Sequence, residues 1–214
     1  AGRREFYRLM VVKGIQIHGQ DIIGQIMSMA HKAGIKVTRG SRHDLDQISS
    51  HHQGVVIESA PYPYADLEDG FALADARGVA PLFLLLDLLQ DPQNLGTLLR
   101  TADAVGVHGV VIPKRRAVDV TPAVVSASAG AVEHLLIAQI TNLSRVIETL
   151  KTQDVWVAGL DADPQAQAYD QADLRGPLAL VVGSEGSGMR RLVREHCDFL
   201  LRLPMHGKIA SLNA

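Results

Sequence analysis

The feature that most constrains the fold is the alternation of short apolar runs with helical segments from Val79 onward. Each apolar run predicts a strand, and the stretches between them show the apolar spacing typical of helices. The predicted strands are 81–86, 109–112, 135–140, 155–160, 178–182 and 199–203, and the predicted helices are 94–105, 121–129, 142–151 and 188–195. Continuously apolar strands alternating with helices predict an α/β domain whose parallel sheet is covered on both faces.

The N-terminal residues form a smaller αβ pattern of their own. Apolar runs at 6–12, 35–37 and 54–57 alternate with a helical segment that ends at Gly34 and a short helical stretch that begins at Ser41. Residues 1–60 carry 8 Lys and Arg against 5 Asp and Glu, a net charge of +3, whereas the rest carries 13 against 18, a net charge of −5. Residues 61–78 are rich in Pro, Ala and Asp and show no period. We therefore expect a small basic domain at 1–60, a linker at 61–78 and a larger domain at 79–214.

Composition excludes several classes of protein. The net charge of −2 over 214 residues excludes a polycation that coats nucleic acid without specificity. A single cysteine, Cys197, excludes an internal disulfide and a multi-cysteine zinc site, and we interpret it as a small buried hydrophobe. The N-terminus does not resemble a signal peptide, so we expect a cytoplasmic protein or one of an organelle matrix.

Neither a membrane nor a metal partner is expected. The longest apolar run, 82–89, is interrupted by Asp87 and is far shorter than the ~20 residues of a membrane span. His51 and His52 are adjacent, but no second group of ligands accompanies them. We interpret both as surface or RNA-contact residues.

Ligands of open parallel sheets bind beyond the carboxyl ends of the strands, where three segments are unusual. The first, D-P-Q-N-L-G-T-L-L-R at 91–100, enters a helix that Asn94 could cap and that carries Arg100. A capped helix with a surface arginine is the simpler interpretation of this segment alone.

The second segment, G-S-E-G-S-G-M at 183–189, is a glycine-rich loop that lets the backbone approach a ligand closely. It lacks the Lys of a phosphate-binding Walker loop, and its glycines are in the reverse order of a dinucleotide fingerprint. Glu185 disfavours phosphate and favours a neutral or cationic ligand. The third segment, L-P-M-H-G-K-I-A-S-L-N at 203–213, would by itself indicate a disordered tail.

Together, N-x-G-x-x-x-R at 94–100, V-V-G-S-E-G-S-G-M at 181–189 and P-M-x-G-x-x-x-S-L-N at 204–213 agree in order and internal spacing with three known motifs. They resemble the motifs of the SpoU family of RNA ribose 2′-O-methyltransferases. His-Gln-Gly at 52–54 and Ser-Ala-Gly-Ala at 128–131 extend the resemblance over nearly the whole chain. The chain is most similar to the bacterial 23S rRNA guanosine 2′-O-methyltransferase group and its mitochondrial relatives.

The resemblance implies a catalytic domain with a deep trefoil knot, an exception to the rule of unknotted chains. It also implies S-adenosylmethionine as methyl donor, a homodimer, ribosomal RNA as partner, and an N-terminal domain like ribosomal protein L30 that binds the RNA. Carried over residue by residue, the donor-binding positions are Gly183, Leu203 and Leu212. The catalytic positions are Asn94, Arg100, Glu185, Ser211 and Asn213.

Methyl transfer from a sulfonium is an in-line displacement that requires positioning and no metal. The family's proposed participant in removing the ribose proton is Arg100. An arginine, with a pKa above ~12, is a poor proton acceptor. We therefore favour Arg100 as a clamp for the neighbouring phosphate and the developing alkoxide, with direct base action as the alternative. Glu185 and Asn213 would orient Arg100 or the ribose.

The sequence departs from the family's pattern at three places. Leu88 stands where the family usually has glycine, which we expect to alter only a loop. The chain begins inside what resembles the first strand of the RNA domain, and ends at Ala214 where the family continues into a long helix. We expect that helix to complete the donor site and the dimer contact.

Three other functions stay open from the sequence. A transfer-RNA ribose methyltransferase is disfavoured because such enzymes typically lack a separate N-terminal domain. A catalytically inactive RNA-binding member of the family would not bind S-adenosylmethionine. A Rossmann-type nucleotide enzyme would bind NAD or ATP, against which the missing Lys and the reversed glycine order argue.

Overall fold

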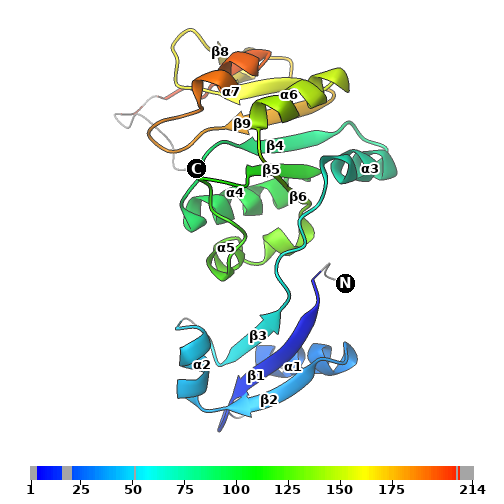
Figure 1. The fold of residues 1–214 in the computed structure, drawn as a ribbon, viewed down its shortest axis with the longest axis vertical. Helices are drawn as coiled ribbons and strands as arrows, with labels where there is room; N and C mark the ends of the chain where they lie inside the picture. The colour runs from blue at the N-terminus through cyan, green and yellow to red at the C-terminus, as the bar shows by residue number, and fades with distance from the viewer. Residues whose placement is uncertain (1–3, 16–20, 51, 206, 208–214) are drawn as a thin grey trace. The chain divides into compact units, whose positions relative to one another are not determined.

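The computed structural model describes residues 4–15, 21–50, 52–205 and 207, and its contacts divide into two compact units, Ala1–Pro63 and Tyr64–Ala214 (Figure 1). The smaller unit has a sheet of order β2-β1-β3 with two helices. Its elements are β1 (Phe6–Val12), α1 (Ile22–Lys32), β2 (Lys36–Gly40), α2 (Arg42–Ile48) and β3 (Val55–Ser59). Strand β1 is central, parallel to β2 and antiparallel to β3.

The core of the smaller unit is built on β1. Leu9 and Val11 are buried and point to the same face, where Ala30 of α1 covers them. Both helices begin at side-chain caps: Asp21 accepts from the Gly24 N–H, and Ser41 forms a capping box with Asp44. These caps explain why two short helices form in a domain with little core.

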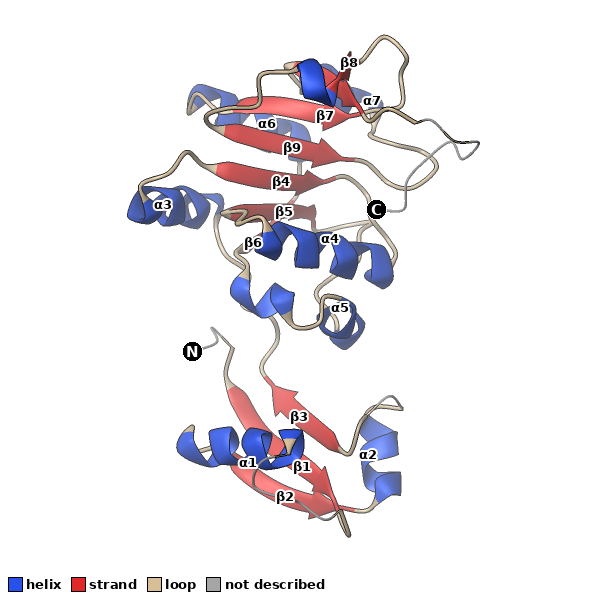
Figure 2. Ribbon diagram, turned by 180° about the vertical axis from the view of Figure 1, so that it is seen from behind, coloured by secondary structure: helices blue, strands red, loops and turns tan. Residues whose placement is uncertain are grey.

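The larger unit has a parallel seven-stranded sheet of order β6-β5-β4-β9-β7-β10-β8. Its first half contains α3 (Leu67–Arg77), β4 (Leu82–Leu86), α4 (Pro92–Ala104), β5 (Gly109–Pro113), α5 (Pro122–Ala127), the 3-10 helix η1 (Ala131–His134) and β6 (Ile137–Ile140). Its second half contains α6 (Leu143–Thr152), β7 (Trp156–Leu160), β8 (Gln167–Ala168), η2 (Tyr169–Gln171), β9 (Leu178–Val182), α7 (Arg191–His196) and β10 (Phe199–Arg202). Figure 2 shows strands β4, β5, β7 and β9 side by side and pointing the same way.

Helices lie on both faces of this sheet. On one face, Phe83 and Leu85 of β4 pack into a core cluster with residues of α3, α6 and α7. On the other face, Leu82 and Leu84 line a cavity of about 680 Å³ together with residues of α4. The α/β class and the parallel sheet predicted from the sequence are thus confirmed, because both faces of the strands are apolar and both receive helices.

The segment 61–78 differs from expectation. We predicted a linker, but helix α3 occupies most of it and packs on the sheet of the larger unit. Asp66 begins the helix with a capping box, and only Gly70 and Ala74 are buried in it besides partly buried Leu67 and Phe71. Helix α3 packs closely on the sheet at Gly70, where a Cβ would lie 2.6 Å from the Phe83 ring. A buried face made of small residues gives a weak period, which is why the sequence did not indicate this helix.

The other predicted elements match the structure within three residues at their ends, whereas the two-residue strand β8 and the 3-10 helices η1 and η2 were not predicted. The largest shifts are three residues. Strand β2 continues to Gly40, past the predicted end at 37, and α7 begins at Arg191 and not at residue 188, because Gly186 and Gly188 take positive φ angles in the preceding loop. Cys197 is half-buried against the core cluster, and burial raises the pKa of its thiol to about 11.

Within the described part of the chain, no helix is both long and apolar enough to cross a membrane. The same residues contain no group of three or more His, Cys, Asp or Glu placed to hold a metal ion.

Candidate functional site

The loops after β4 and β9 lie next to each other at the carboxyl edge of the larger sheet. This follows from the strand order, because β4 and β9 are hydrogen-bonded parallel neighbours. The ladder continues one step past the strands, where the Asp87 N–H donates to the Val182 carbonyl over 2.8 Å. Segments about 90 residues apart in the sequence therefore meet at this edge, which is where open parallel sheets bind ligands.

Asn94 and Glu185 are brought into contact by these two loops. The Asn94 Nδ2 donates to Glu185 Oε2 over 2.9 Å, and Asn94 is buried whereas Glu185 is exposed. Asn94 does not cap the helix as we had expected. Asp91 is the cap, accepting from the Gln93 and Asn94 N–H groups, and Pro92 takes the first helical position. The Asn94 side chain is thereby left available for the site.

Gly183 is required by the folding of the glycine-rich loop onto itself. Ser184 and Gly188 exchange two backbone hydrogen bonds of 3.1 and 2.9 Å, which closes the loop into a tight turn. A Cβ on Gly183 would lie 2.2 Å from the carbonyl carbon of Gly188. Only glycine fits this position, and the loop presents backbone groups to the adjoining space.

That space is a cavity of about 500 Å³ with Gly183 and Leu203 in its wall. The wall also contains Met189, the carboxylate residue Asp161 and the guanidinium residue Arg194. Two of the three predicted donor-binding residues thus line one cavity, in the 300–1,000 Å³ range of small-molecule sites. Leu212, the third, lies outside the described residues.

Asp87 and Arg190 hold the two loops together, and sequence reasoning missed both. The Asp87 side chain has 0% exposure and accepts from the Arg190 N–H over 2.8 Å and from its guanidinium over 2.7 and 2.9 Å. A buried carboxylate is stable only with such partners. The signal was visible in the sequence: Asp87 interrupts an apolar run at the end of a strand.

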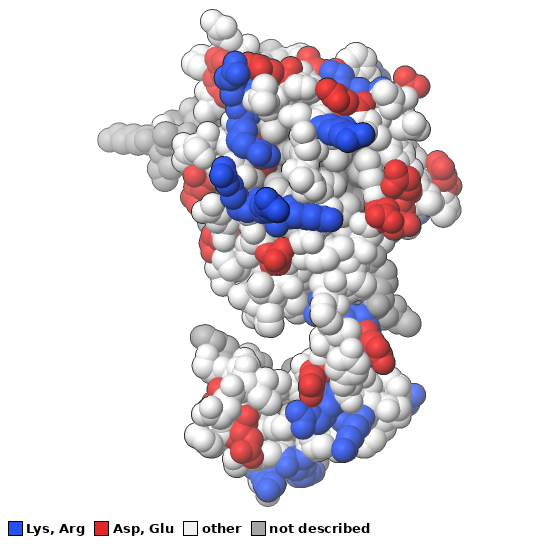
Figure 3. All heavy atoms as spheres, viewed as in Figure 1, with Lys and Arg blue, Asp and Glu red and all other residues white. Residues whose placement is uncertain are grey.

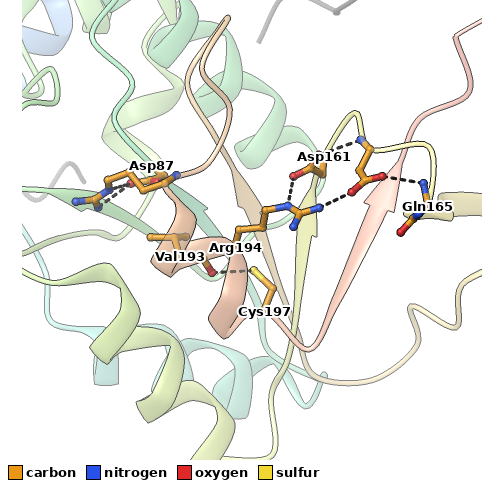
Figure 4. A network of polar contacts seen from close by, with 8 residues as sticks. Asp87, Asp161, Gln165, Val193, Arg194 and Cys197 are labelled. Carbon is orange, nitrogen blue, oxygen red and sulfur yellow. Dashed lines mark hydrogen bonds and ion pairs between the residues drawn. The ribbon is translucent and has the colours of Figure 1, made fainter.

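Arg194 of α7 fixes the loop that follows β7. Its guanidinium donates to Asp161 over 2.8 Å and to Asp163 over 2.6 Å (Figure 4). The Asp161 carboxylate raises the pKa of Arg194 above its usual value. This pair holds one wall of the cavity in place, since both Asp161 and Arg194 line it.

The loop after β4 carries local strain. Leu88 has a φ angle of 62°, a left-handed conformation in which glycine would be unstrained. This is the position where the SpoU pattern has glycine. Leu88 and Asp91 line a smaller cavity of about 280 Å³ together with Asn94 and Glu185. The departure at Leu88 therefore lies at the site itself.

Comparison with known families decides to which group this arrangement belongs. Residues 81–214 match the model of the SpoU rRNA methylase family, and residues 1–65 match the model for RNA 2′-O ribose methyltransferase substrate binding. The chain belongs to the SpoU rRNA methylase family. The resemblance inferred from the three motifs is confirmed.

Curated relatives share this assignment over nearly the whole chain. The protein named YacO from Bacillus subtilis, of the TrmH family of tRNA/rRNA methyltransferases, is 49% identical over 99% of this chain and 84% of its own length. A TrmH-family protein from Staphylococcus saprophyticus is 46% identical over 90% of this chain and 77% of its own length.

Solved structures agree in fold. The SpoU methyltransferase AviRb from Streptomyces viridochromogenes, in complex with AdoMet, matches with a TM-score of 0.77 and 22% identity over 99% of this chain and 78% of its own. A TrmH-family structure from Porphyromonas gingivalis matches with a TM-score of 0.70 and 26% identity over 99% of this chain and 78% of its own.

The remaining catalytic candidates of this SpoU chain are not brought together by the described residues. Arg100 is exposed on α4 and does not line the cavity that Asn94 and Glu185 share. Six residues separate it from Asn94, which places it ~9 Å along the helix and on another side. Ser211 and Asn213 lie outside the described residues, so their roles stay predictions.

The other two segments of the resemblance have structural roles. Ser128 is fully buried at the turn after α5, and a Cβ on Gly96 would lie 2.3 Å from the Ala127 Cβ, so this turn is where α4 packs.

His52 was expected at the surface or on RNA. Its side chain is instead 3% exposed, bonding Asp46 through Nε2 and accepting from the Gly54 N–H. His51 lies outside the described residues.

Proposed function

We propose that this chain transfers a methyl group from S-adenosylmethionine to a ribose 2′-hydroxyl, of a guanosine in large-subunit ribosomal RNA. The observation that carries the proposal is the hydrogen bond between Asn94 and Glu185, which joins two loops beside a cavity walled by Gly183 and Leu203. Asn94 and Glu185 belong to two of the three family motifs and lie 91 positions apart in the sequence.

The cavity fits the donor chemically. Its volume of about 500 Å³ and its Leu160, Leu201 and Met205 walls suit an adenosine-containing molecule, and the backbone of the glycine-rich loop offers hydrogen-bonding groups. Asp161 in its wall is paired with Arg194 of the same wall, so the two charges balance and this side of the cavity does not repel a cationic ligand. When bound, S-adenosylmethionine supplies an electrophilic methyl group on a sulfonium.

The residues of the chain then serve to position the ribose. Glu185 Oε2 fixes one N–H of the Asn94 amide, so its other N–H and its Oδ1 are oriented for a hydroxyl at the edge of the sheet. Arg100 is proposed as the group that holds the neighbouring phosphate and the developing alkoxide, because its guanidinium is already protonated near neutral pH and has no site to accept the proton. Ser211 and Asn213 are proposed to contact the same ribose.

Ribosomal RNA is favoured over transfer RNA by the smaller unit. A solved structure of 2′-OH methylation of C/U34 on tRNA matches only 63% of this chain, at 26% identity and a TM-score of 0.54. An RNA 2′-O ribose methyltransferase structure of the same identity matches 98%, with a TM-score of 0.71. A chain with a separate substrate-binding unit suits a large folded RNA. Transfer RNA stays the alternative, since curated relatives are named for both substrates.

Three further expectations belong to the same proposal. We propose that the enzyme is a cytoplasmic homodimer, that its C-terminal loops form a trefoil knot, and that the smaller unit is the L30-like domain that binds the RNA. The match of residues 1–65 to a substrate-binding family supports the last of these.

The test is methyl transfer from labelled S-adenosylmethionine to 23S rRNA and, separately, to bulk transfer RNA. We expect label only in the ribosomal RNA, in a nucleotide that resists alkaline hydrolysis and co-migrates with 2′-O-methylguanosine. Label only in transfer RNA would select the alternative. Donor binding by calorimetry without transfer to either RNA would contradict both.

A further inference from the structure

A basic loop lies one strand away from the Asn94 and Glu185 side chains. Lys114, Arg115 and Arg116 follow β5, whose carboxyl end is next to that of β4 in the sheet. Neighbouring strands are about 5 Å apart, so the basic loop begins at the edge where the loop after β4 begins. The order of carboxyl-end loops along this edge is therefore basic loop, β4 loop, glycine-rich loop.

These three side chains are exposed, and in the part of the chain that the structure describes none of them forms an ion pair. Among the other exposed cations of the larger unit that the structure describes, four pair with carboxylates, Arg175 and Arg191 among them, whereas Arg77, Arg100 and Arg145 form no ion pair. The nearby carboxylate of Asp119 accepts from Gln139 over 2.6 Å and is not bonded to the loop. Three adjacent unpaired cations are therefore available to an anionic partner.

The backbone of the basic loop is fixed at both ends. The Lys114 N–H donates to the Ile140 carbonyl over 2.8 Å, and the Val118 N–H donates to the Leu89 carbonyl over 2.9 Å. The second bond connects the basic loop directly to the strained loop of Leu88. Within the basic loop Arg116 has a φ angle of 59°, a backbone conformation that residues other than glycine rarely adopt. Arg116 therefore places its side chain at a position whose backbone conformation would suit glycine.

The charge of the larger unit as a whole does not account for this loop. Residues 61–214 carry a net charge of −5, yet Lys114, Arg115 and Arg116 are three consecutive cations. Figure 3 shows Lys and Arg side chains of the larger unit gathered in patches on the visible face, with Asp and Glu patches beside them. Positive charge is thus gathered locally on an acidic unit. Such a distribution is typical of a surface that contacts phosphates.

We propose that Lys114, Arg115 and Arg116 bind the backbone phosphates of the RNA strand whose ribose enters the site at Asn94 and Glu185. This rests on the proposed function, because it takes the substrate to be RNA. It assigns to the larger unit its own RNA contact, separate from the substrate-binding unit. Arginine guanidinium groups suit this role because they bind phosphate oxygens in pairs.

The experiment measures affinity for a 23S rRNA transcript at several salt concentrations, with the full chain and four variants. In Lys114→Gln/Arg115→Gln/Arg116→Gln we expect affinity to fall at least tenfold near 0.15 M salt. The slope of log affinity against log salt should flatten by about 2, or ~0.7 for each lost contact to single-stranded RNA. Affinity for S-adenosylmethionine should stay within twofold of the parent.

Arg115→Gln and Arg77→Gln form a matched pair, because each removes one exposed positive charge from the larger unit. Arg77 lies at the end of α3, before β4, and hence at the opposite edge of the sheet. We expect a weaker salt dependence only in Arg115→Gln. Equal effects of the two variants would overturn the proposal, since net charge alone would then explain them. An unchanged slope in the triple variant would overturn it as well.

Arg116→Gly separates RNA binding from folding. Glycine relieves the left-handed backbone strain, so its melting temperature should equal or exceed that of the parent while RNA affinity falls. Unchanged RNA affinity in this variant would show that the Arg116 side chain does not bind RNA. The proposed function fails separately: a parent that binds RNA through this loop but methylates none contradicts the activity alone. A triple variant that binds and methylates RNA as well as the parent contradicts this inference alone.

Discussion

The two units of this molecule differ in the size of their hydrophobic cores. The smaller unit packs two helices on three strands, and its core cluster has Leu9, Val11 and Ala30 as its buried residues. The larger unit packs helices on both faces of seven strands, with a continuous cluster from Phe83 to Val193. A small core stabilises a fold that presents charge, whereas a large one can also stabilise a strained, specifically shaped site.

The positions of backbone strain illustrate this difference. Among the residues described, those other than glycine with positive φ are Leu88, Arg116, Ala129 and Asp154, and all four belong to the larger unit. Two of them lie in loops at the carboxyl edge of the sheet. Each such residue costs about 1–2 kcal/mol, which the extensive burial of the larger unit can offset.

The largest effect should come from Gly183→Ala in the larger unit. Because the added Cβ would lie 2.2 Å from the Gly188 backbone, the glycine-rich loop must open, and we expect S-adenosylmethionine affinity to fall at least a hundredfold by calorimetry. Gly176→Ala, just before β9 at the opposite edge of the sheet, is the control: it strains the backbone at a φ of 90°, but no described atom lies within 4 Å of its Cβ, so donor affinity should stay parent-like. RNA binding through the smaller unit should persist. Parent-like donor affinity in Gly183→Ala would show that the cavity beside this loop is not the donor site.

The next effect concerns stability of the larger unit. Asp87→Asn removes the charge from a fully buried group that accepts hydrogen bonds from Arg190. We expect the free energy of unfolding, measured in urea, to fall by about 2 kcal/mol, typical of hydrogen bonds to a charged group. In the control Asp173→Asn, the partner Arg175 is 91% exposed, and the change should be under ~0.5 kcal/mol. Equal losses in the two variants would mean that burial of Asp87 does not matter.

A smaller effect is expected from charges of the smaller unit. Lys36, Arg39 and Arg42 are exposed on β2 and at the start of α2. Their joint replacement by Gln should lower RNA affinity about tenfold and flatten its salt dependence, leaving donor affinity unchanged. Arg8→Gln should change RNA affinity less, because Arg8 already pairs with Glu58 over 3.1 Å. Unaltered salt dependence in the triple variant would indicate that the smaller unit contributes little through charge.

The smallest effect is a pH dependence of the larger unit. Burial, and next the charge of Arg77, lower the pKa of His108 from 6.5, and its Nδ1 accepts the Leu82 N–H. The unfolded state therefore binds the proton more readily, so stability is fully present above pH 6.5 and decreases as pH falls below it. His108→Asn should flatten this decrease in urea unfolding between pH 6.5 and 5. The same substitution at exposed His134 should not, and a parallel curve for both would contradict the assignment.

The sequence by itself determined which segments form most elements and which residues belong to motifs. Strand β9 matches its predicted range because a continuous apolar run followed by glycines permits little else. Helix α3 was not predicted because its buried side includes Gly70 and Ala74, and small residues give no clear apolar period. The sequence marked the glycine-rich loop, and the family resemblance singled out Gly183 within it. The structure supplied the reason, a close approach to Gly188 five residues later.

Only the tertiary structure decided which of these residues meet. Asn94 contacts Glu185 across 91 positions, and Asp87 contacts Arg190 across 103. Both contacts form because β9 pairs with β4 in the sheet, although the strands β5 to β8 come between them in the sequence. The place of the basic loop at Lys114 beside that site follows from the same strand order. Local spacing specifies helices and strands through backbone and side-chain periodicity. Strand order depends on long-range packing of many apolar faces at once, which no single segment encodes.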